Sequence, residues 1–251
     1  MTAARLALLL GAGAAAGIVG SAGGTASLIS YPALLAAGLP PLAANVTNAV
    51  AFVAAWPGSA VGSRTELRGQ GPWLRRWAGL AVAGSAAGAA LLLLTPAAAF
   101  DRLVPFLLAF AALALLLQPW LAARLARHPA GRSRLILAGG LIATSAYDGY
   151  WGAGAGVMTL ALLMITGEPD LARSNALKNM LLGVADVTCC AVFVVFWPVD
   201  WATAAPMAAG FLAGSVIGPS VTRHLPGPVL RIAAALAGLG VAVHLWIAGR
   251  K

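Results

Sequence analysis

The first apolar run of the chain, "LALLLGAGAAAGIVGSAGGTASLISYPALLAA" (residues 6–37), carries no charge over 32 residues. A straight helix of that length would measure about 48 Å, whereas the hydrocarbon layer of a bilayer is only ~30 Å thick. Several glycines stand in the middle of the run. We therefore expect a membrane element that is broken or turned back at the glycines. Because the sequence stays free of charge as far as Ser63, the run does not fit a cleaved signal peptide.

The composition extends this conclusion to the whole chain. Its 251 residues are 61% hydrophobic and only 9% charged, and the mean hydropathy is +0.89. Ordinary globular domains carry roughly 25% charged residues. Apolar stretches of about 20 residues recur without the period-two alternation of a β-barrel. The composition predicts an all-α polytopic membrane protein.

The net charge of +9 does not indicate nucleic acid as a partner. Two clusters of arginine separate the apolar segments, as positive charge does in cytoplasmic loops. The clusters are Arg64, Arg68, Arg75 and Arg76, then Arg124, Arg127, Arg132 and Arg134. Most of the tryptophans, Trp56 among them, lie near segment ends, as in an aromatic belt.

The chain reads as a duplication with an offset of about 130 residues. Gly17, Gly20 and Gly24 align with Gly149, Gly152 and Gly156, and "GSAAG" (84–88) aligns with "GSVIG" (214–218). We expect two homologous membrane repeats, 1–128 and 129–251, a plan typical of secondary transporters. Each half has about four hydrophobic segments, and the first of each is broken or re-entrant. The expected segments are 6–37, 41–63, 73–95 and 102–122, then 135–166, 170–197, 201–222 and 228–248.

The positive-inside rule does not decide whether the first segment of each half spans the membrane or is re-entrant. Either arrangement places 11 Lys and Arg residues inside and 4 outside, with Lys178 within the membrane. Both arrangements put 64–76 and 124–134 in the cytoplasm.

Two glycine runs are the first candidate site. They are "GIVGSAGGT" (17–25) and "YDGYWGAGAG" (147–156). A helix broken at such a run frees backbone N–H groups, which favour an anion, although the same glycines also permit tight helix packing. The candidate binding residues here are Gly20, Gly23, Gly24 and Thr25, then Tyr147, Gly152, Gly154 and Gly156.

A polar cluster follows each glycine run by about 20 residues. "NVTN" supplies Asn45, Thr47 and Asn48, and "SNALKN" supplies Asn175, Lys178 and Asn179. Polar side chains at membrane depth either face a cavity or bond a neighbouring helix. Lys178 is one of only two lysines, against 14 arginines, and its compact ammonium suits contact with an anion. Asp148 and Asp186 are candidates for proton coupling, or for an ion pair with Lys178.

Other kinds of chemistry lack their residues. Cys189 and Cys190 are adjacent, so they point in different directions and form neither a metal site nor a CxxC motif, and we read them as core residues. "GSAAG" (84–88) lacks the spacing of a nucleophile elbow. We expect no enzyme activity, no cofactor and no metal.

These residues resemble the sulfite exporter TauE/SafE family, also called the TSUP or DUF81 membrane transporters. Duplicated halves, each with a glycine-rich motif and a later proline, characterise that family. "GIVGSAGGTASLISYP" and "GLPPLAANVTN" match it in the first half, and "YDGYWGAGAG" and "ARSNALKN" match it in the second. The first motif departs from the pattern, because it reads "SAGG" where the family has three successive glycines.

The resemblance implies a secondary transporter of small anions in the bacterial inner (cell) membrane, exporting sulfite or an organosulfonate by alternating access. Its partners would be a small anion, with sulfur compounds as candidates, and the lipid bilayer, with homo-oligomerisation left open. A passive channel built on the same scaffold is the alternative, and a non-transport membrane protein is a third hypothesis.

Overall fold

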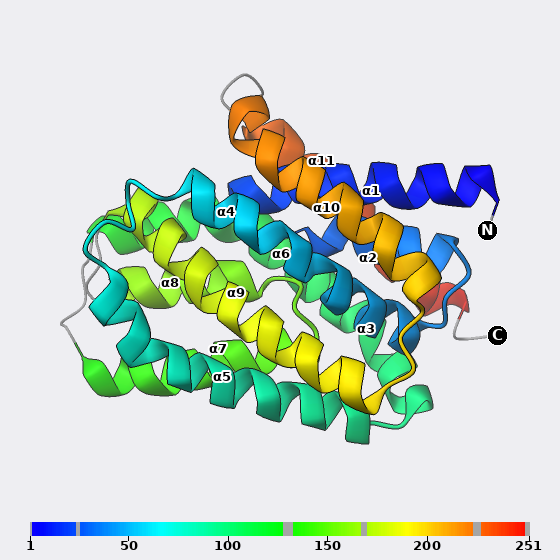
Figure 1. Cartoon of the computed structure of the whole chain (residues 1–251), viewed down its shortest axis with the longest axis horizontal. Helices are drawn as coiled ribbons and strands as arrows, with labels where there is room; N and C mark the ends of the chain where they lie inside the picture. The colour runs from blue at the N-terminus through cyan, green and yellow to red at the C-terminus, as the bar shows by residue number, and fades with distance from the viewer. Residues whose placement is uncertain (1, 24–25, 128–132, 167–169, 223–226, 249–251) are drawn as a thin grey trace.

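A computed structural model describes residues 2–23, 26–127, 133–166, 170–222 and 227–248 (Figure 1). Within these ranges the regular structure is helical throughout, with one 3-10 turn and no strand. The helices are α1 (Ala3–Gly23), α2 (Ser27–Ala36), α3 (Pro41–Phe52), α4 (Trp56–Gly62), α5 (Gly71–Leu94), α6 (Ala97–Arg127), α7 (Arg134–Tyr150), α8 (Ala155–Ile165), α9 (Leu171–Phe196), α10 (Trp201–Thr222) and α11 (Gly227–Ala248); the 3-10 turn η1 is Val53–Ala55.

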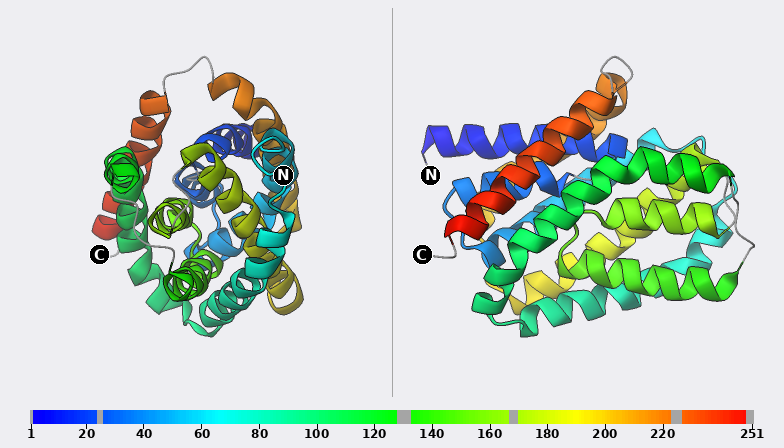
Figure 2. Two further views of the ribbon diagram at one scale, coloured as in Figure 1. Left: turned by 90° about the vertical axis from the view of Figure 1, so that its left-hand side faces the viewer. Right: turned by 180° about the vertical axis from the view of Figure 1, so that it is seen from behind.

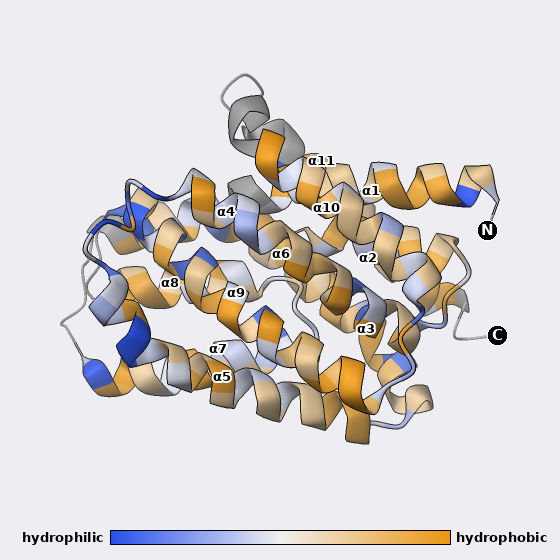
Figure 3. Cartoon of the chain, viewed as in Figure 1, coloured by the Kyte–Doolittle hydropathy of each residue, from blue (hydrophilic) through white to orange (hydrophobic). Residues whose placement is uncertain are grey.

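The helices of the bundle are apolar over most of their length (Figure 3), and large apolar side chains lie on the outside. Leu94, Leu135 and Phe196 are 80%, 86% and 71% exposed, and many other large apolar side chains accompany them. In water, an apolar surface of this extent would drive aggregation, whereas lipid tails cover it without cost. Within the described residues, α1, α5, α6 and α9 have the length and composition to cross a bilayer. The chain is a polytopic helical membrane protein.

The expected segment ends agree with α5, α9, α10 and α11 to within two residues. The segment expected at 102–122 is longer, since α6 begins at Ala97 and ends at Arg127. The segment expected at 41–63 is not one helix but α3, η1 and α4 in succession. Pro57 explains the interruption: it has no N–H to bond the carbonyl of Val53, and its ring crowds that carbonyl.

The second glycine run interrupts its helix. α7 ends at Tyr150 and α8 begins at Ala155. Between them, Gly152 and Gly154 have φ angles of +80° and +92°, which side chains with a Cβ rarely adopt. In the first half, α1 ends at Gly23 and α2 begins at Ser27, with Gly24 and Thr25 outside the described residues.

Both interrupted segments fold back as helical hairpins. α1 contacts α2, and α7 contacts α8. In Figures 1 and 2, α2 returns toward the end of the bundle where α1 starts, and α8 returns toward the end where α7 starts. The two hairpins enter from opposite ends, so their tips approach each other inside the bundle.

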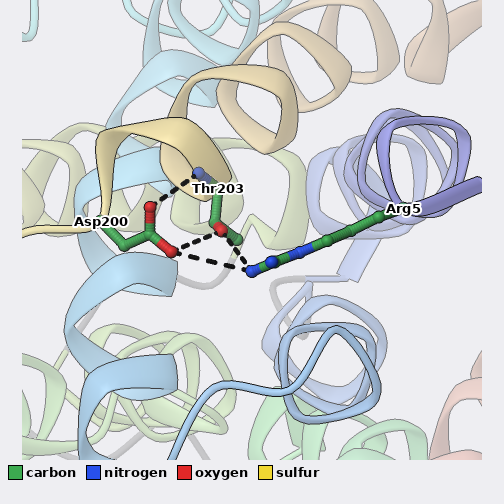
Figure 4. Close-up of polar contacts among 3 residues, drawn as sticks. All are labelled: Arg5, Asp200 and Thr203. Atoms are coloured by element: carbon green, nitrogen blue, oxygen red, sulfur yellow. Dashed lines mark hydrogen bonds and ion pairs between the residues drawn. The ribbon is translucent and has the colours of Figure 1, made fainter. Parts of the chain in front are cut away.

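A polar contact ties the start of α1 to the start of α10 (Figure 4). Nη2 of Arg5 donates to Oγ1 of Thr203 at 2.9 Å and lies 3.7 Å from Oδ2 of Asp200. Thr203 in turn donates to Asp200 at 2.7 Å. The N-terminal end of α1 therefore lies at the same end of the bundle as the α9–α10 connection.

The first helix of each half packs closely against a helix of the other half. α1 lies along α10, and α5 lies along α7. Glycines make both contacts possible: a Cβ on Gly17 would lie 2.6 Å from the carbonyl oxygen of Phe211, and one on Gly84 would lie 2.5 Å from that of Ile142. Since neither helix pair has room for a methyl group at these points, the backbones touch directly.

Candidate functional site

A cavity of about 70 Å³ lies where the two hairpin tips meet α3, α4 and α9. A buried water occupies about 10–15 Å³ on the same measure, so the cavity has room for several waters or one small solute. Gly20 and Ser27 line it from the first hairpin, and Gly152 and Gly156 line it from the second.

Lys178 is the cationic side chain of the cavity. It lies on α9, is 2% exposed and lines the cavity wall. Although Asp148 and Asp186 line the same cavity and are described in full, neither carboxylate lies within 4.0 Å of the Lys178 amine. The eight residues from Lys178 to Asp186 separate their backbones by about 12 Å along α9, beyond what a lysine side chain spans. A buried ammonium without a carboxylate against it is a costly arrangement that an anion would relieve.

Asp148 on α7 and Asp186 on α9 instead interact with each other on the cavity wall, and the residues are 8% and 9% exposed. Oδ2 of Asp148 is buried and has no hydrogen-bond partner among the described residues. The cavity thus has an ammonium and a carboxyl pair at two separate places on its wall.

Two tryptophan indoles add hydrogen-bond donors. Trp56 and Trp151 both line the cavity, and the Nε1 of each is buried without a partner in the described part of the chain. A buried indole N–H normally finds an acceptor. Trp56 lies against Gly183 of α9, where a Cβ would overlap its ring. Together with Lys178, these indoles place donors without an acceptor among the residues that line the cavity.

The asparagines of the first half are already bonded. Nδ2 of Asn45 donates to the carbonyl oxygen of Tyr150 at 2.9 Å, which joins α3 to the end of α7. Asn48 donates to Oγ of Ser27 at 3.1 Å and accepts from Oγ of Ser30 at 2.6 Å. Both amides line the cavity and also hold the hairpins against α3.

Most amides of the second break bond within the turn itself. Trp151 and Gly152 donate to the carbonyl of Tyr147, Ala153 donates to that of Trp151, and Ala155 donates to that of Gly152. The expectation that the break frees its N–H groups is therefore wrong for these four residues. Side chains, rather than the backbone of the break, supply the donors described above.

The structure brings nine of the predicted site residues to the cavity. They are Gly20, Asn45, Asn48, Asp148, Gly152, Gly156, Lys178, Asn179 and Asp186. Thr47, Asn175, Tyr147 and Gly154 do not lie on its wall: Tyr147 donates to the carbonyl of Ala153 at 2.8 Å, and Gly154 caps α8 beside Ala111. Gly23 is the last residue of α1, and Gly24 and Thr25 lie outside the described residues.

Sequence reasoning missed several residues of the wall, among them Ser27, Trp56, Trp151 and Cys189. The sequence predicts Trp56 in the aromatic belt, but next to the break at Pro57 its ring lies against Gly183 of α9. Cys189 is buried, as expected of a core residue, yet it also reaches the cavity beside Asp186. The signal for Trp151 was present, since it is the tryptophan inside a glycine run.

Comparison with known proteins agrees with this architecture. The family model described as "Sulfite exporter TauE/SafE" matches residues 9–245. A "Probable membrane transporter protein" of Haemophilus influenzae is 30% identical over 222 residues, which cover 85% of this chain and 83% of that protein. The "Probable membrane transporter protein YfcA" of Escherichia coli is 29% identical over 208 residues, covering 81% and 75%. No solved structure matches the chain.

A bundle of apolar helices with two broken hairpins around a buried polar cavity is the architecture of a membrane transporter. The chain belongs to the sulfite exporter TauE/SafE family. The prediction of family and class from the sequence is confirmed.

Proposed function

We propose that this protein is a secondary transporter of small anions in the bacterial inner membrane, exporting sulfite or an organosulfonate by alternating access. One observation carries the proposal: within the described residues, Lys178 lines a buried cavity with two tryptophans whose indole N–H groups have no partner, and no carboxylate lies within 4.0 Å of its amine. These donors have no acceptor among the described residues, and an oxyanion supplies several acceptor oxygens at once. The sulfur chemistry and the outward direction rest on the family name.

The anion would lie between the side-chain donors. Lys178, Trp56 and Trp151 would bind its oxygens, and the amide of Asn179 lies on the same wall. The glycines Gly20, Gly152 and Gly156 keep the wall open because they have no side chain. The remaining predicted residues, Gly23, Gly24, Thr25, Thr47, Tyr147, Gly154 and Asn175, stay predictions.

The chain would consist of two homologous repeats, 1–128 and 129–251. Support comes from contacts that recur in both halves: α1 packs on α10 as α7 packs on α5, and α2 packs on α11 as α8 packs on α6. Gly17 lies close to Ser215, and Gly149 lies close to Ser85. These two contacts are equivalent, because the sequence alignment pairs Gly17 with Gly149 and Ser85 with Ser215.

The hairpins favour the re-entrant arrangement, in which the two repeats have opposite orientations. The α4–α5 connection and the start of α7 then lie at one end of the bundle, where Figure 3 shows hydrophilic segments. Arg64, Arg68, Arg75 and Arg76, in the α4–α5 connection and the start of α5, are exposed. That end faces the cytoplasm by the positive-inside rule. Rocking of one repeat against the other would open the cavity to each side in turn.

The test is transport and binding by variants of Lys178 reconstituted in liposomes. Lys178→Met removes the charge and keeps the length, and it should weaken sulfite or isethionate binding roughly 10- to 100-fold, the value of a hydrogen bond to a charged group. Lys178→Arg should retain part of the affinity. The control is Arg102→Met, an exposed cation on α6.

Unchanged anion affinity in a folded Lys178→Met variant would refute the binding role. The concentration dependence of flux separates the two transport classes: a carrier saturates, and a passive channel gives linear flux. Failure of the native protein to bind or move any sulfur oxyanion would exclude this substrate class.

A further inference from the structure

We propose that the Asp148–Asp186 carboxyl pair binds a proton when an anion enters the cavity, so that the protein moves the two in the same direction. This inference rests on the proposed function and names its coupling ion. It begins with the geometry of three groups on one cavity wall: Lys178, and the two carboxyl groups that face each other.

Two buried carboxyl groups on one cavity wall favour sharing one proton, because two like charges close together in a site nearly without water are unfavourable. Both are about nine-tenths buried, and no cation lies within 4.0 Å of either in the described chain. Their charge is therefore not neutralised by a salt bridge. Oδ2 of Asp148, buried and without a partner, is an oxygen at which a further proton would bind.

The charges of the cavity explain why proton and anion bind together. An ammonium at Lys178 and a carboxyl pair holding one proton sum to zero. A monovalent anion entering alone would leave one net negative charge in a site nearly without water, which is unfavourable. When a second proton binds the pair, the loaded cavity is neutral again, as the empty one is. Only these two neutral forms would cross between the inward-open and outward-open states.

The proton path is balanced at each end of the cycle. On the side where the cavity is open, a proton passes from bulk water to a carboxylate oxygen of the pair as the anion binds. On the other side, the anion leaves and the same proton returns to bulk water. No bond other than O–H forms or breaks. The direction of net flux is then set by the sum of the anion and proton gradients.

Few other ionisable groups face this pair. On α9 they are Lys178, Cys189 and Cys190, and on α7 they are Tyr147 and Tyr150. The helices α3, α4 and α8, which pack against α9, carry no ionisable side chain. The ionisable residues of α5 are Arg75 and Arg76, which are exposed at its far end. Among these groups, the pair is the one to which we assign the effect of external pH on the cavity.

The experiment uses liposomes that contain the full-length protein and a trapped pH dye, with isethionate as the probe. Its sulfonate stays ionised in the working range, so any proton that moves is carried by the protein. With native protein, an inward isethionate gradient should acidify the lumen, and uptake should rise up to tenfold per unit decrease in external pH, the limit for one proton. A clamped membrane potential should have no effect on uptake.

The double variant Asp148→Asn/Asp186→Asn keeps the shape of the pair and removes its titration, whereas either single variant retains one carboxylate that can still bind the proton. The double variant should still move isethionate, but without acidification, and its uptake should now respond to the membrane potential. If the two aspartates had only a structural role, their replacement would lower the rate of uptake without making that rate depend on the membrane potential. The control is Asp101→Asn, an exposed carboxylate on α6, which should behave as the native protein does.

Isethionate uptake without proton movement in the native protein would overturn the coupling and leave the proposed transport intact. Loss of uptake on replacing Na⁺ by choline would overturn it as well, because Na⁺ would then be the coupling ion. If neither isethionate nor sulfite enters, the proposed function fails, and this inference fails with it. Proton uptake on binding, measured by calorimetry in buffers of different ionisation enthalpy, should be one for the native protein and zero for the double variant Asp148→Asn/Asp186→Asn.

Discussion

The contact between α5 and α7 predicts that Gly84→Ala destabilises the protein, whereas Gly79→Ala on the same helix does not. A Cβ on Gly84 would lie 2.5 Å from the carbonyl oxygen of Ile142 and 3.0 Å from Cβ of Ser145. A Cβ on Gly79 would have no atom of another residue within 4 Å. The two substitutions are chemically identical, so their difference isolates the helix contact.

The magnitude follows from the distance. Carbon and carbonyl oxygen in contact are usually ~3.3–3.6 Å apart, so α5 and α7 must separate by about 1 Å to admit the methyl group. A gap of that size removes a quarter to a half of the van der Waals attraction energy of each contact along the interface. Overpacking of this kind lowers the free energy of unfolding by about 1–3 kcal/mol, and the better helix propensity of alanine raises it by less than about 1 kcal/mol. We expect a net loss of about 2 kcal/mol for Gly84→Ala and no loss for Gly79→Ala.

Thermal unfolding in a mild detergent, followed by tryptophan fluorescence, measures this difference. For a chain of this size a change of 2 kcal/mol corresponds to roughly 4–8 °C in Tm. The equivalent comparison on the other side of the bundle is Gly17→Ala with Gly11→Ala, since Gly17 meets the carbonyl of Phe211 at 2.6 Å and Gly11 meets nothing within 4 Å. Equal Tm values within either pair would refute direct backbone contact at that interface.

Three further predictions concern the cavity, the break and the orientation. Gly183→Ala should displace the Trp56 ring and weaken anion binding roughly tenfold, because one hydrogen-bond donor to a charged ligand is lost. Transport should remain saturable. An unchanged Kd for the anion would exclude Trp56 as a ligand. Gly154→Ala should cost about 1–2 kcal/mol because its φ is +92°, whereas Gly139→Ala in α7, with nothing within 4 Å, should be neutral in the same unfolding assay. Alkaline phosphatase fused to the C-terminus should be active outside the cytoplasm and inactive when fused within residues 63–70; the reverse pattern would contradict the proposed orientation.

Sequence reasoning predicted the helices because apolar length and glycine position are local signals. Four segments agree with their helices to within two residues, and the break at 151–154 lies inside the glycine run that predicted it. Lys178 was identified from its rarity and its apolar surroundings, and it lies on the cavity wall. A buried charge is conspicuous in sequence because the membrane makes it expensive.

The rest of the site depends on contacts between distant segments, which no local pattern contains. Trp56 sits near the end of an apolar segment, as an interfacial tryptophan does, and only the packing of α4 on α9 shows that its ring faces the cavity. Asp148 and Asp186 were each considered as a partner of Lys178. Their contact with each other required α7 and α9 to be placed side by side.

The two halves contribute unequally to the cavity, and this inequality is itself testable. The charged residues of the wall, Asp148, Lys178 and Asp186, all come from the second half. An offset of 129 residues, given by Leu42 and Leu171, places Ala49 at the position of Lys178, and Ala49 lines the cavity too. One ammonium suffices for one anion, and a second would be an uncompensated buried charge, which the membrane penalises.

If the repeats are related by pseudo-symmetry around the anion, a lysine at the equivalent position of the first half should bind the anion as Lys178 does. Ala49→Lys added to Lys178→Met should restore anion affinity to within about tenfold of the native value, whereas Ala49→Met in the same background should not. The measurement is the Kd for isethionate, with Tm as the check on folding. Equal affinities of the two double variants, both folded, would show that the site depends on α9 alone and that the symmetry does not extend to the chemistry.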